Sequence, residues 1–295
     1  MKSFWLLVLI AFVVLPITAT QAADRSIAVR HKGPQSETDN RPRYFVDLLH
    51  ATLEATRSDY GAYNIEQTPE FISQSRALWL LERNRSLDVV WTMTSNEREQ
   101  QVMPIRIPLM KGLLGVRLLL INPDKQADFA KVNSLSELRR YIAVQGHDWP
   151  DTKILMANQL VVKTDQRYDE LFKLVELGRY GFFPRGVLEI YEELKQHPDS
   201  RLVIEPHLVI AYPSPIYFFV NKENHYLAER LEVGLRRLIA NGEFDRLLSN
   251  HALHRNALQS MHLEKRTLIK LKNPGLPPDT PLNDPTLWWD MDLFQ

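Results

Sequence analysis

The 295-residue chain has no cysteine, no excess of charge of either sign and only one long apolar run that no polar or charged residue interrupts. The absence of cysteine excludes disulfides, cysteine-ligated metal sites, a thiol nucleophile and a lipidated N-terminal cysteine. Lys plus Arg and Asp plus Glu each number 36, whereas a general binder of nucleic acid or anionic membranes carries a basic excess. A single apolar run also excludes a transporter or channel made of several membrane spans.

The apolar run lies at the N-terminus and is typical of a secretion signal. Lys2 precedes it, Phe4 to Ile17 form it, and the small residues of 18–23 follow it. A spanning helix needs about 20 apolar residues, so this run is too short. We expect cleavage after Ala22, with Ala23 as the alternative site; the other interpretation is a retained N-terminal anchor. The mature chain is expected to be periplasmic, without membrane insertion after cleavage.

Strand-like and helix-like segments alternate along the rest of the chain. Short β-type runs at 26–30, 63–68 and 87–94 are separated by helical periodicity at 41–57 and after Pro69. This β-α-β-α-β order predicts a parallel sheet with helices on both faces.

A second alternating set follows the apolar run at 112–121. Strands are expected at 141–145 and 180–184, with helices between and after them, and a second apolar run at 208–220 contains two prolines. Two α/β units joined by two long extended crossings predict an α/β fold of two lobes, with ligands bound in the crevice between them.

We place the hinge near 112–115 and 212–215. The predicted boundaries are a signal peptide at 1–22, the first part of lobe 1 at 23–111, lobe 2 at 112–213, the second part of lobe 1 at 214–272 and a C-terminal tail at 273–295. The tail is rich in proline and contains Trp288 and Trp289. This composition favours an extended segment that docks on the body of the protein.

The sharpest local feature is the turn at 92–98, directly after a predicted strand. Its hydroxyls, a helix N-cap and Arg98 within one turn offer donors to a carboxylate or another oxyanion. An ordinary capped helix with an exposed arginine accounts equally well for the same spacing.

This region resembles the first lobe of the family 3 periplasmic solute-binding proteins. These are the polar amino-acid type, with the type II periplasmic-binding-protein fold. The strand at 88–91, Thr94 and the pair Glu97-Arg98 carry the resemblance. In that family the arginine of the turn grips the α-carboxylate of the ligand, so the resemblance implies this role for Arg98, with an added hydrogen bond from Thr94.

The second lobe resembles the same family, and the resemblance covers about residues 25–250. The segment 141–146 is similar to a strand and loop whose backbone N–H groups meet the same carboxylate, which implies a role for the Gly146 amide. The segment 177–183 is similar to the family's later G-R-x-D-A strand. The resemblance further implies a monomer, a small-molecule ligand, and an ABC permease or membrane-bound sensor as partner, with no nucleic acid and no cofactor.

Two departures from the family pattern concern the ligand. An acidic residue just beyond the G-R-x-D-A strand usually holds the ligand ammonium, whereas Arg185 or Gly186 stands there in this chain. A cation at that place repels an ammonium and attracts an anion. Asp148 remains able to meet an amine, although a helix cap before Pro150 explains it as well. The resemblance therefore does not by itself imply an ordinary amino-acid ligand, and we expect a small anionic or zwitterionic molecule.

Aromatic and charged residues supply weaker candidates. Trp91 and Trp149 either wall the pocket and stack on a ligand or belong to the core. Tyr44 lies at the start of the first predicted helix, and its position is equally consistent with facing the cleft and with not facing it. The charged residues of the loop at 37–41 lie at the cleft edge in this fold, and a solvated loop is the simpler interpretation. The predicted ligand-binding residues are Arg98, Thr94, Gly146, Arg185, Trp149, Asp148, Trp91 and Tyr44.

These observations predict an exported solute-binding protein that captures a small carboxylate-bearing ligand, an amino acid or a related organic acid. Hydrolase, zinc-protease and nucleotide-binding motifs are absent, and we predict no catalytic residue and no metal site. The alternative is a dehydratase-like exported enzyme on the same scaffold, for which Glu37, His147 and Asp148 are the obvious acid–base groups. A signalling or structural protein is the third hypothesis.

Overall fold

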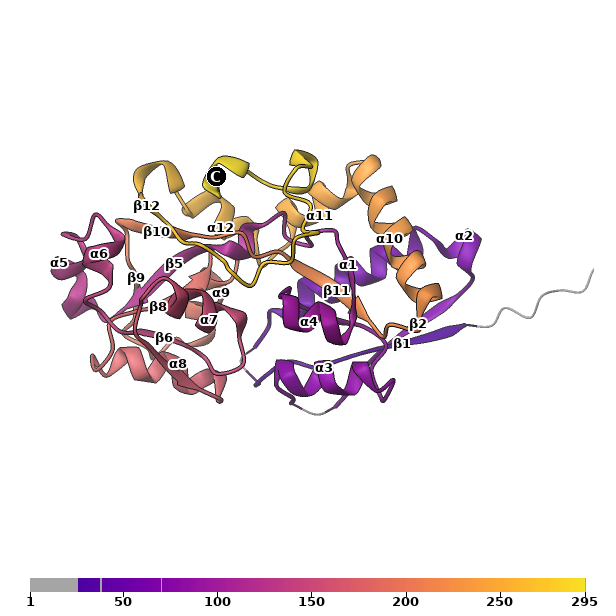
Figure 1. Cartoon of the computed structure of the whole chain (residues 1–295), viewed down its shortest axis with the longest axis horizontal. Helices are drawn as coiled ribbons and strands as arrows, with labels where there is room; N and C mark the ends of the chain where they lie inside the picture. Colours follow the sequence, from indigo (N-terminus) through magenta and orange to yellow (C-terminus); the bar gives the residue numbers. More distant parts are fainter. Residues whose placement is uncertain (1–25, 38, 70, 295) are drawn as a thin grey trace, which may run out of the picture.

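Two α/β lobes lie side by side in the computed structural model (Figure 1), which describes residues 26–37, 39–69 and 71–294. The predicted signal peptide at 1–22 lies outside the described residues. No helix within the described ranges combines the length and the apolar character that crossing a membrane requires.

The sheet of lobe 1 has the strand order β2-β1-β3-β11-β4. Its strands are β1 (Ile27–His31), β2 (Tyr63–Gln67), β3 (Val90–Met93), β4 (Met103–Ile105) and β11 (Ile216–Val220). β1 and β2 are parallel, a bridge from His31 to Val89 joins β1 to the start of β3, and β11 runs antiparallel between β3 and β4. The predicted β-α-β-α-β order is therefore present, and the sheet is completed by a strand from much later in the chain.

Helices cover both faces of this sheet. They are α1 (Pro42–Glu54), α2 (Arg57–Tyr60), α3 (Gln74–Glu82), α4 (Asn96–Gln101), α10 (His225–Ala240) and α11 (Glu243–Asn250). In α1 the predicted apolar spacing is the buried face, since Leu48, Leu49 and Leu53 are fully buried. The second helix begins at Gln74, later than predicted, because the Ser73 side chain caps it.

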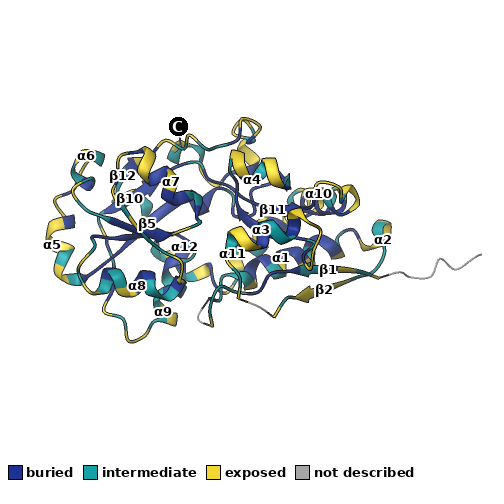
Figure 2. Cartoon of the chain, turned by 60° about the horizontal axis from the view of Figure 1, so that its bottom comes forward, coloured by how far each residue is buried: buried dark blue, intermediate teal, exposed yellow. Residues whose placement is uncertain are grey.

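Lobe 2 has the strand order β12-β10-β5-β8-β6-β7. Its strands are β5 (Val116–Ile121), β6 (Ala143–Gly146), β7 (Val162–Asp165), β8 (Phe183–Gly186), β9 (Val203–Ile204), β10 (Leu208–Ala211) and β12 (Thr267–Lys270), and β9 also pairs with β5. Its helices are α5 (Gln126–Phe129), α6 (Leu135–Leu138), α7 (Pro150–Ala157), α8 (Tyr168–Glu176), α9 (Ile190–Gln196) and α12 (Arg255–Ser260). The central strands of both sheets, such as β5, β10 and β11, are buried, whereas the edge strands β2 and β7 and the outer faces of the helices are partly exposed (Figure 2).

The chain passes between the lobes at three places. β4 leads into β5 and β10 leads into β11, as the two apolar runs predict, and these crossings touch through a 3.1 Å hydrogen bond from the Tyr212 N–H to the Gly115 carbonyl. The third passage follows α11.

The boundary predicted at 214–272 is wrong for its last part, because β12 pairs in parallel with β10 and so belongs to the sheet of lobe 2. The sequence of the four-residue strand β12 contains no pattern that shows which of the two sheets it joins.

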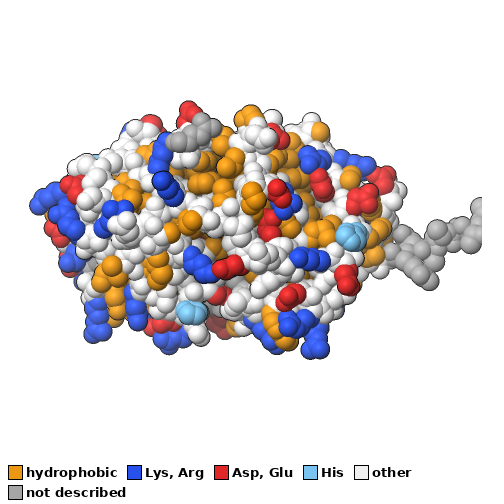
Figure 3. All heavy atoms as spheres, in the orientation of Figure 1, with side chains coloured by type: hydrophobic (Ala, Val, Ile, Leu, Met, Phe, Trp, Pro, Cys, Tyr) orange, Lys and Arg blue, Asp and Glu red, His pale blue; other side chains and the backbone are white. Residues whose placement is uncertain are grey.

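The C-terminal tail touches both lobes and the crossings between them. Asn158 of lobe 2 donates to the Lys272 carbonyl at 2.8 Å and accepts its N–H at 3.0 Å. The Asn96 N–H of lobe 1 donates to the Gly275 carbonyl at 3.0 Å. Asn273 bonds the Pro213 carbonyl on the second crossing at 2.9 Å. Hydrophobic side chains gather where the tail crosses this face, and charges of both signs are spread over the rest of it (Figure 3).

The end of the tail packs on the first crossing through Trp288. Gly112 has φ of +78°, and a Cβ there would lie 2.3 Å from the Trp288 ring, so the glycine serves both the left-handed turn and the close packing. The Trp288 Nε1 donates to the Pro281 carbonyl at 2.8 Å, and the Trp289 N–H donates to the Lys111 carbonyl at 2.8 Å. The tail therefore fastens the hinge from outside.

Trp288 is 4% exposed, whereas its neighbour Trp289 is 42% exposed. Trp288→Ala is expected to lower the free energy of unfolding by about 3 kcal/mol, because it removes a large buried ring and leaves a cavity over the crossing. Trp289→Ala, the matched control, should change it by less than about 1 kcal/mol. Urea denaturation followed by circular dichroism measures both values, and equal losses in the two variants would contradict a fastening role for Trp288.

Candidate functional site: a charged cavity between the lobes

A cavity of about 70 Å³ lies between the two lobes, enough for a few water molecules. We call it the central cavity. Its charged lining residues are Lys32, Asp39, Arg41, Arg117, Asp151, Arg185 and Glu189, and its larger apolar ones are Phe45, Trp91, Met93, Leu114, Trp149 and Ile216. Lobe 1 contributes the loop between β1 and α1, the start of α1, Gln74 and β3. Lobe 2 contributes β5, β8 and the start of α7.

The wall from lobe 2 is built of buried ion pairs. Arg185 is 1% exposed and donates from Nε and Nη2 to Glu193 at 2.8 and 2.6 Å, while Glu189 lies 3.2 Å from the same Nη2. Burial alone would raise the pKa of Glu193, but Arg185 lowers it below its ordinary value. Arg185, predicted as a positive contact for the ligand, therefore lines the cavity with its charge already balanced.

Arg117 forms the second buried ion pair of this wall. Its Nη2 lies 2.5 Å from Asp151 Oδ1, which also accepts the Tyr212 hydroxyl at 2.5 Å. The Arg117 Nε has no hydrogen-bond partner among the described residues. A single arginine within the apolar run 112–121 was the sequence signal for this residue, because a lone charge in a buried strand needs a buried partner.

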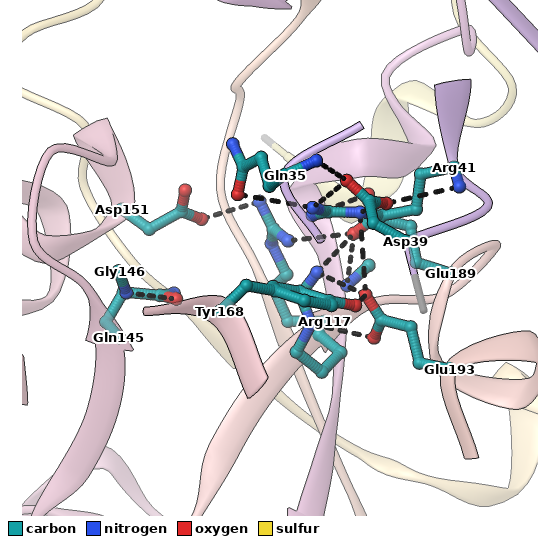
Figure 4. A network of polar contacts seen from close by, with 12 residues as sticks. Gln35, Asp39, Arg41, Arg117, Gln145, Gly146, Asp151, Tyr168, Glu189 and Glu193 are labelled. Carbon is teal, nitrogen blue, oxygen red and sulfur yellow. Dashed lines mark hydrogen bonds and ion pairs between the residues drawn. The ribbon is translucent and has the colours of Figure 1, made fainter. Parts of the chain in front are cut away.

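Arg41 reaches from lobe 1 into the wall of lobe 2 (Figure 4). Its Nε donates to Asp39 at 2.6 Å, and its guanidinium lies 4.0 Å from both Glu189 and Glu193. The same group lies over the Tyr168 ring of α8, 4.4 Å from the centroid. The loop at 37–41, interpreted from sequence as solvated, thus supplies charges that bridge the two lobes.

Lys32 follows β1 and is 5% exposed. Its ammonium group makes no hydrogen bond or ion pair with any residue that the structure describes. Burial lowers the pKa of Lys32 to about 8, against the attraction of Asp39. No local pattern pointed to Lys32, because a lysine in a polar loop is usually exposed.

Arg98, the predicted carboxylate anchor, does not line the central cavity. Its Nη1 donates to the Thr92 hydroxyl at 2.6 Å and to the Met93 carbonyl at 2.8 Å. Its Nη2 donates to Gln74 Oε1 at 2.9 Å and to the Asp148 carbonyl of lobe 2 at 3.0 Å. Burial lowers the pKa of Arg98 to about 10, and each of these four acceptors is a neutral oxygen.

Arg98, Thr94 and Asp148 instead line a groove of about 730 Å³ beside the tail, between α4 and α7. The Thr94 hydroxyl donates to Glu99 at 2.6 Å. Asp148 Oδ2 accepts the Ser75 N–H and hydroxyl at 2.8 and 2.9 Å. Thr94 thus bonds within lobe 1, whereas Arg98 and Asp148 each bond a residue of the other lobe. All three predicted residues are held by the protein itself.

Gly146 and Tyr44 also differ from the prediction. The Gly146 N–H, expected to meet a ligand, donates to Gln145 Oε1 at 3.2 Å, and a Cβ on Gly146 would lie 2.4 Å from the Trp149 ring. Gly146 therefore allows Trp149 to pack closely against β6. Tyr44 is a core residue rather than a cavity residue: it is 1% exposed and donates to the Leu109 carbonyl at 2.7 Å.

Three of the eight predicted residues, Trp91, Trp149 and Arg185, line the central cavity. The acid–base candidates of the enzyme hypothesis, Glu37, His147 and Asp148, line a separate groove of about 580 Å³. No group of histidine and acidic residues within the described ranges is arranged to hold a metal ion.

No model of a known protein family matches the sequence, and no curated protein matches it. Solved structures do match its fold. A Salmonella typhimurium periplasmic binding protein with high arginine specificity is 16% identical, covering 75% of this chain and 97% of its own, with a TM-score of 0.57. A histidine kinase sensor domain similar to periplasmic binding proteins is 16% identical, covering 77% and 96%, with a TM-score of 0.57.

The substrate-binding protein of an amino acid ABC transporter is 13% identical, covering 76% of this chain and 98% of its own, with a TM-score of 0.53. Identities this low establish the fold alone, and they leave the ligand to the residues of the cavity. Together with the two-lobed topology, these matches show that the chain has the type II periplasmic-binding-protein fold and is distant in sequence from the proteins that share it.

Proposed function

We propose that this protein is an exported solute-binding protein that closes its two lobes around a small carboxylate-bearing molecule. The observation that carries the proposal is the central cavity, which lies between the lobes and is lined by charged residues from both. The fold supports it, because inter-lobe cavities are preferred ligand sites. The N-terminal run, typical of a secretion signal, supports a periplasmic location.

Closure of the lobes is the step that a partner would recognise. Contacts such as those of Arg41 with Glu189 and Glu193 exist only when the lobes meet. A ligand that favours the closed conformation therefore shifts the population of conformations toward it. An ABC permease or a membrane-bound sensor would then distinguish loaded from empty protein. Both kinds of system occur among the proteins of similar fold.

The mature chain, starting at Ala23, is expected to bind at least one small carboxylate. A ligand at 100 times its dissociation constant stabilises the folded state by about 2.7 kcal/mol, which raises Tm by roughly 5–10 °C in a protein of this size. A thermal-shift screen of amino acids, short organic acids, dicarboxylates and keto acids measures this rise. Each acid is paired with its uncharged amide and with sodium chloride at equal ionic strength. Shifts that the amides reproduce, or no shift with any acid, would contradict the proposal.

Arg41 is expected to hold the lobes together. Arg41→Gln leaves the buried Asp39 without its cation. Among the described residues, it also removes the only lobe 1 arginine beside Glu189 and Glu193, which keep Arg185. It should therefore lower the free energy of unfolding by about 3 kcal/mol and increase the radius of gyration measured by small-angle X-ray scattering. Lys153→Gln is the matched control, because its inter-lobe pair with Glu97 is highly exposed and should contribute less than about 1 kcal/mol. An unchanged radius of gyration in Arg41→Gln would show that the closed arrangement does not depend on this residue.

A further inference from the structure

Lys32 is the one charged residue of the central cavity for which the described part of the chain supplies no hydrogen-bond or ion-pair partner. It is 5% exposed and lines the same space as Trp91 and Trp149. The other cations there, Arg41, Arg117 and Arg185, each pair with a carboxylate. A buried charge without a partner is unfavourable in the empty protein, so the position of Lys32 calls for an anion from outside the chain.

The charged groups around Lys32 do not satisfy it. Asp39 attracts it, but this carboxylate already accepts two hydrogen bonds from the Arg41 guanidinium, at 2.6 and 3.0 Å, and the Gln35 N–H at 2.9 Å. Asp148 attracts Lys32 more weakly than Asp39 does, and its Oδ2 already accepts hydrogen bonds from Ser75. Arg41 and Arg98 oppose its charge.

We propose that Lys32 Nζ, rather than Arg98, binds the carboxylate of the ligand, and that the ligand is a short-chain monocarboxylate without an ammonium group. This inference rests on the function proposed above and names the ligand class for that site. Arg98 then has a positioning role, since its four bonds to neutral oxygens connect β3, α3 and the Asp148 loop of lobe 2.

The size and pairing of the cavity define this ligand class. About 70 Å³ admits only a few heavy atoms, and the faces of Trp91 and Trp149 suit a short apolar chain. A ligand ammonium needs a carboxylate that is not already paired with a cation. Asp39 and Asp151 are each paired with an arginine, and Glu189 lies 3.2 Å from Arg185. A second ligand carboxylate would find no second unpaired cation among the described residues that line the cavity, because Arg41, Arg117 and Arg185 each pair with a carboxylate of the protein.

Four compounds of similar size test the ligand class by isothermal titration calorimetry at pH 7. Propionate has one carboxylate, propionamide is its uncharged analogue, L-alanine adds an ammonium group and succinate adds a second carboxylate. We expect the wild-type protein to bind propionate, to give no signal with propionamide, and to bind alanine and succinate at least tenfold more weakly than propionate. Alanine or succinate binding as tightly as propionate would overturn the ligand class.

Three variants test the role of Lys32. Lys32→Met should weaken propionate binding at least thirtyfold, Lys32→Arg should retain part of the affinity because it keeps the charge, and Lys153→Met, an exposed control in lobe 2, should bind as the wild type does. For the wild type, affinity should fall as pH rises above 8, where the buried ammonium loses its proton. This fall should be absent in Lys32→Arg.

The empty protein gives a second measurement that needs no ligand. Lys32→Met should raise its Tm by several degrees, because an unpaired buried cation is replaced by an apolar side chain of similar length. The pKa of Lys32 is lowered on folding, so its destabilising effect is complete below pH 8 and fades between pH 8 and about 10.5. The difference in Tm between the two proteins should shrink over the same interval.

The outcomes separate this inference from the function on which it rests. Propionate binding that is unchanged in Lys32→Met, or a lower Tm for the empty variant, overturns the assignment to Lys32 and leaves the solute-binding function standing. Failure of every carboxylate in both panels to bind the wild-type protein overturns the function, and the inference with it.

Discussion

Burial of charged side chains between the two lobes is the constraint on which the rest of the structure depends. Arg41, Arg117 and Arg185 bring guanidinium groups into a space with little room for water, and such groups are tolerated only when they are paired. Their carboxylate partners lie on the loop before α1, on α7 and on α9. Arg41 belongs to one lobe and approaches the carboxylates of the other, so closure and charge pairing occur together.

Buried ion pairs of this kind mainly determine how the two lobes are positioned relative to each other, and contribute less to overall stability. Replacing such a pair by apolar groups is often neutral for stability, whereas the loss of one partner is strongly unfavourable. A shift of one lobe against the other would separate Arg41 from Glu189 and Glu193 and leave charges exposed to a poorly hydrated cleft. We interpret the network as a device that permits one closed arrangement and penalises near alternatives. The tail adds to this restriction, because it bonds Asn158 in one lobe and Asn96 in the other.

Sequence patterns predicted the layers of the fold and much less of its site. Apolar patterns placed α1 and the strands β1, β2, β3, β6 and β8, because burial of a face repeats at a fixed interval along a helix or strand. The short strands β4, β7, β9 and β12 were not predicted. The same periodicity could not say whether the buried Tyr44 faced the core or the cleft. The pairing of β12 with β10 depends on contacts between segments far apart in the chain, and four residues carry too little pattern to choose a lobe.

The residues of the site show the same limit more clearly. The turn at 92–98 was recognised because its strand, cap and helix are local, and Ser95 does cap α4. What Arg98 bonds is decided by Gln74 and by Asp148 of the other lobe, which no spacing around Arg98 reveals. Arg117 had a signal, a charge within an apolar strand, whereas Lys32 had none. Functional residues on loops are therefore the part of this protein that required three-dimensional neighbours to identify.

Arg98 and Lys32 illustrate how two buried cations of one lobe can differ in role. A guanidinium carries five N–H donors in a planar fork, and Arg98 uses four of them on oxygens from three segments of both lobes. Its geometry suits the connection of segments from the two lobes, and a ligand carboxylate would have to displace these protein partners to bind it. An ammonium is a compact point charge on a flexible stem, and Lys32 retains its donors. The retained arginine of a familiar turn is therefore weaker support for carboxylate binding than an unpaired lysine in an ordinary loop, because the partners of a charge, and not its place in a motif, determine what it can still bind.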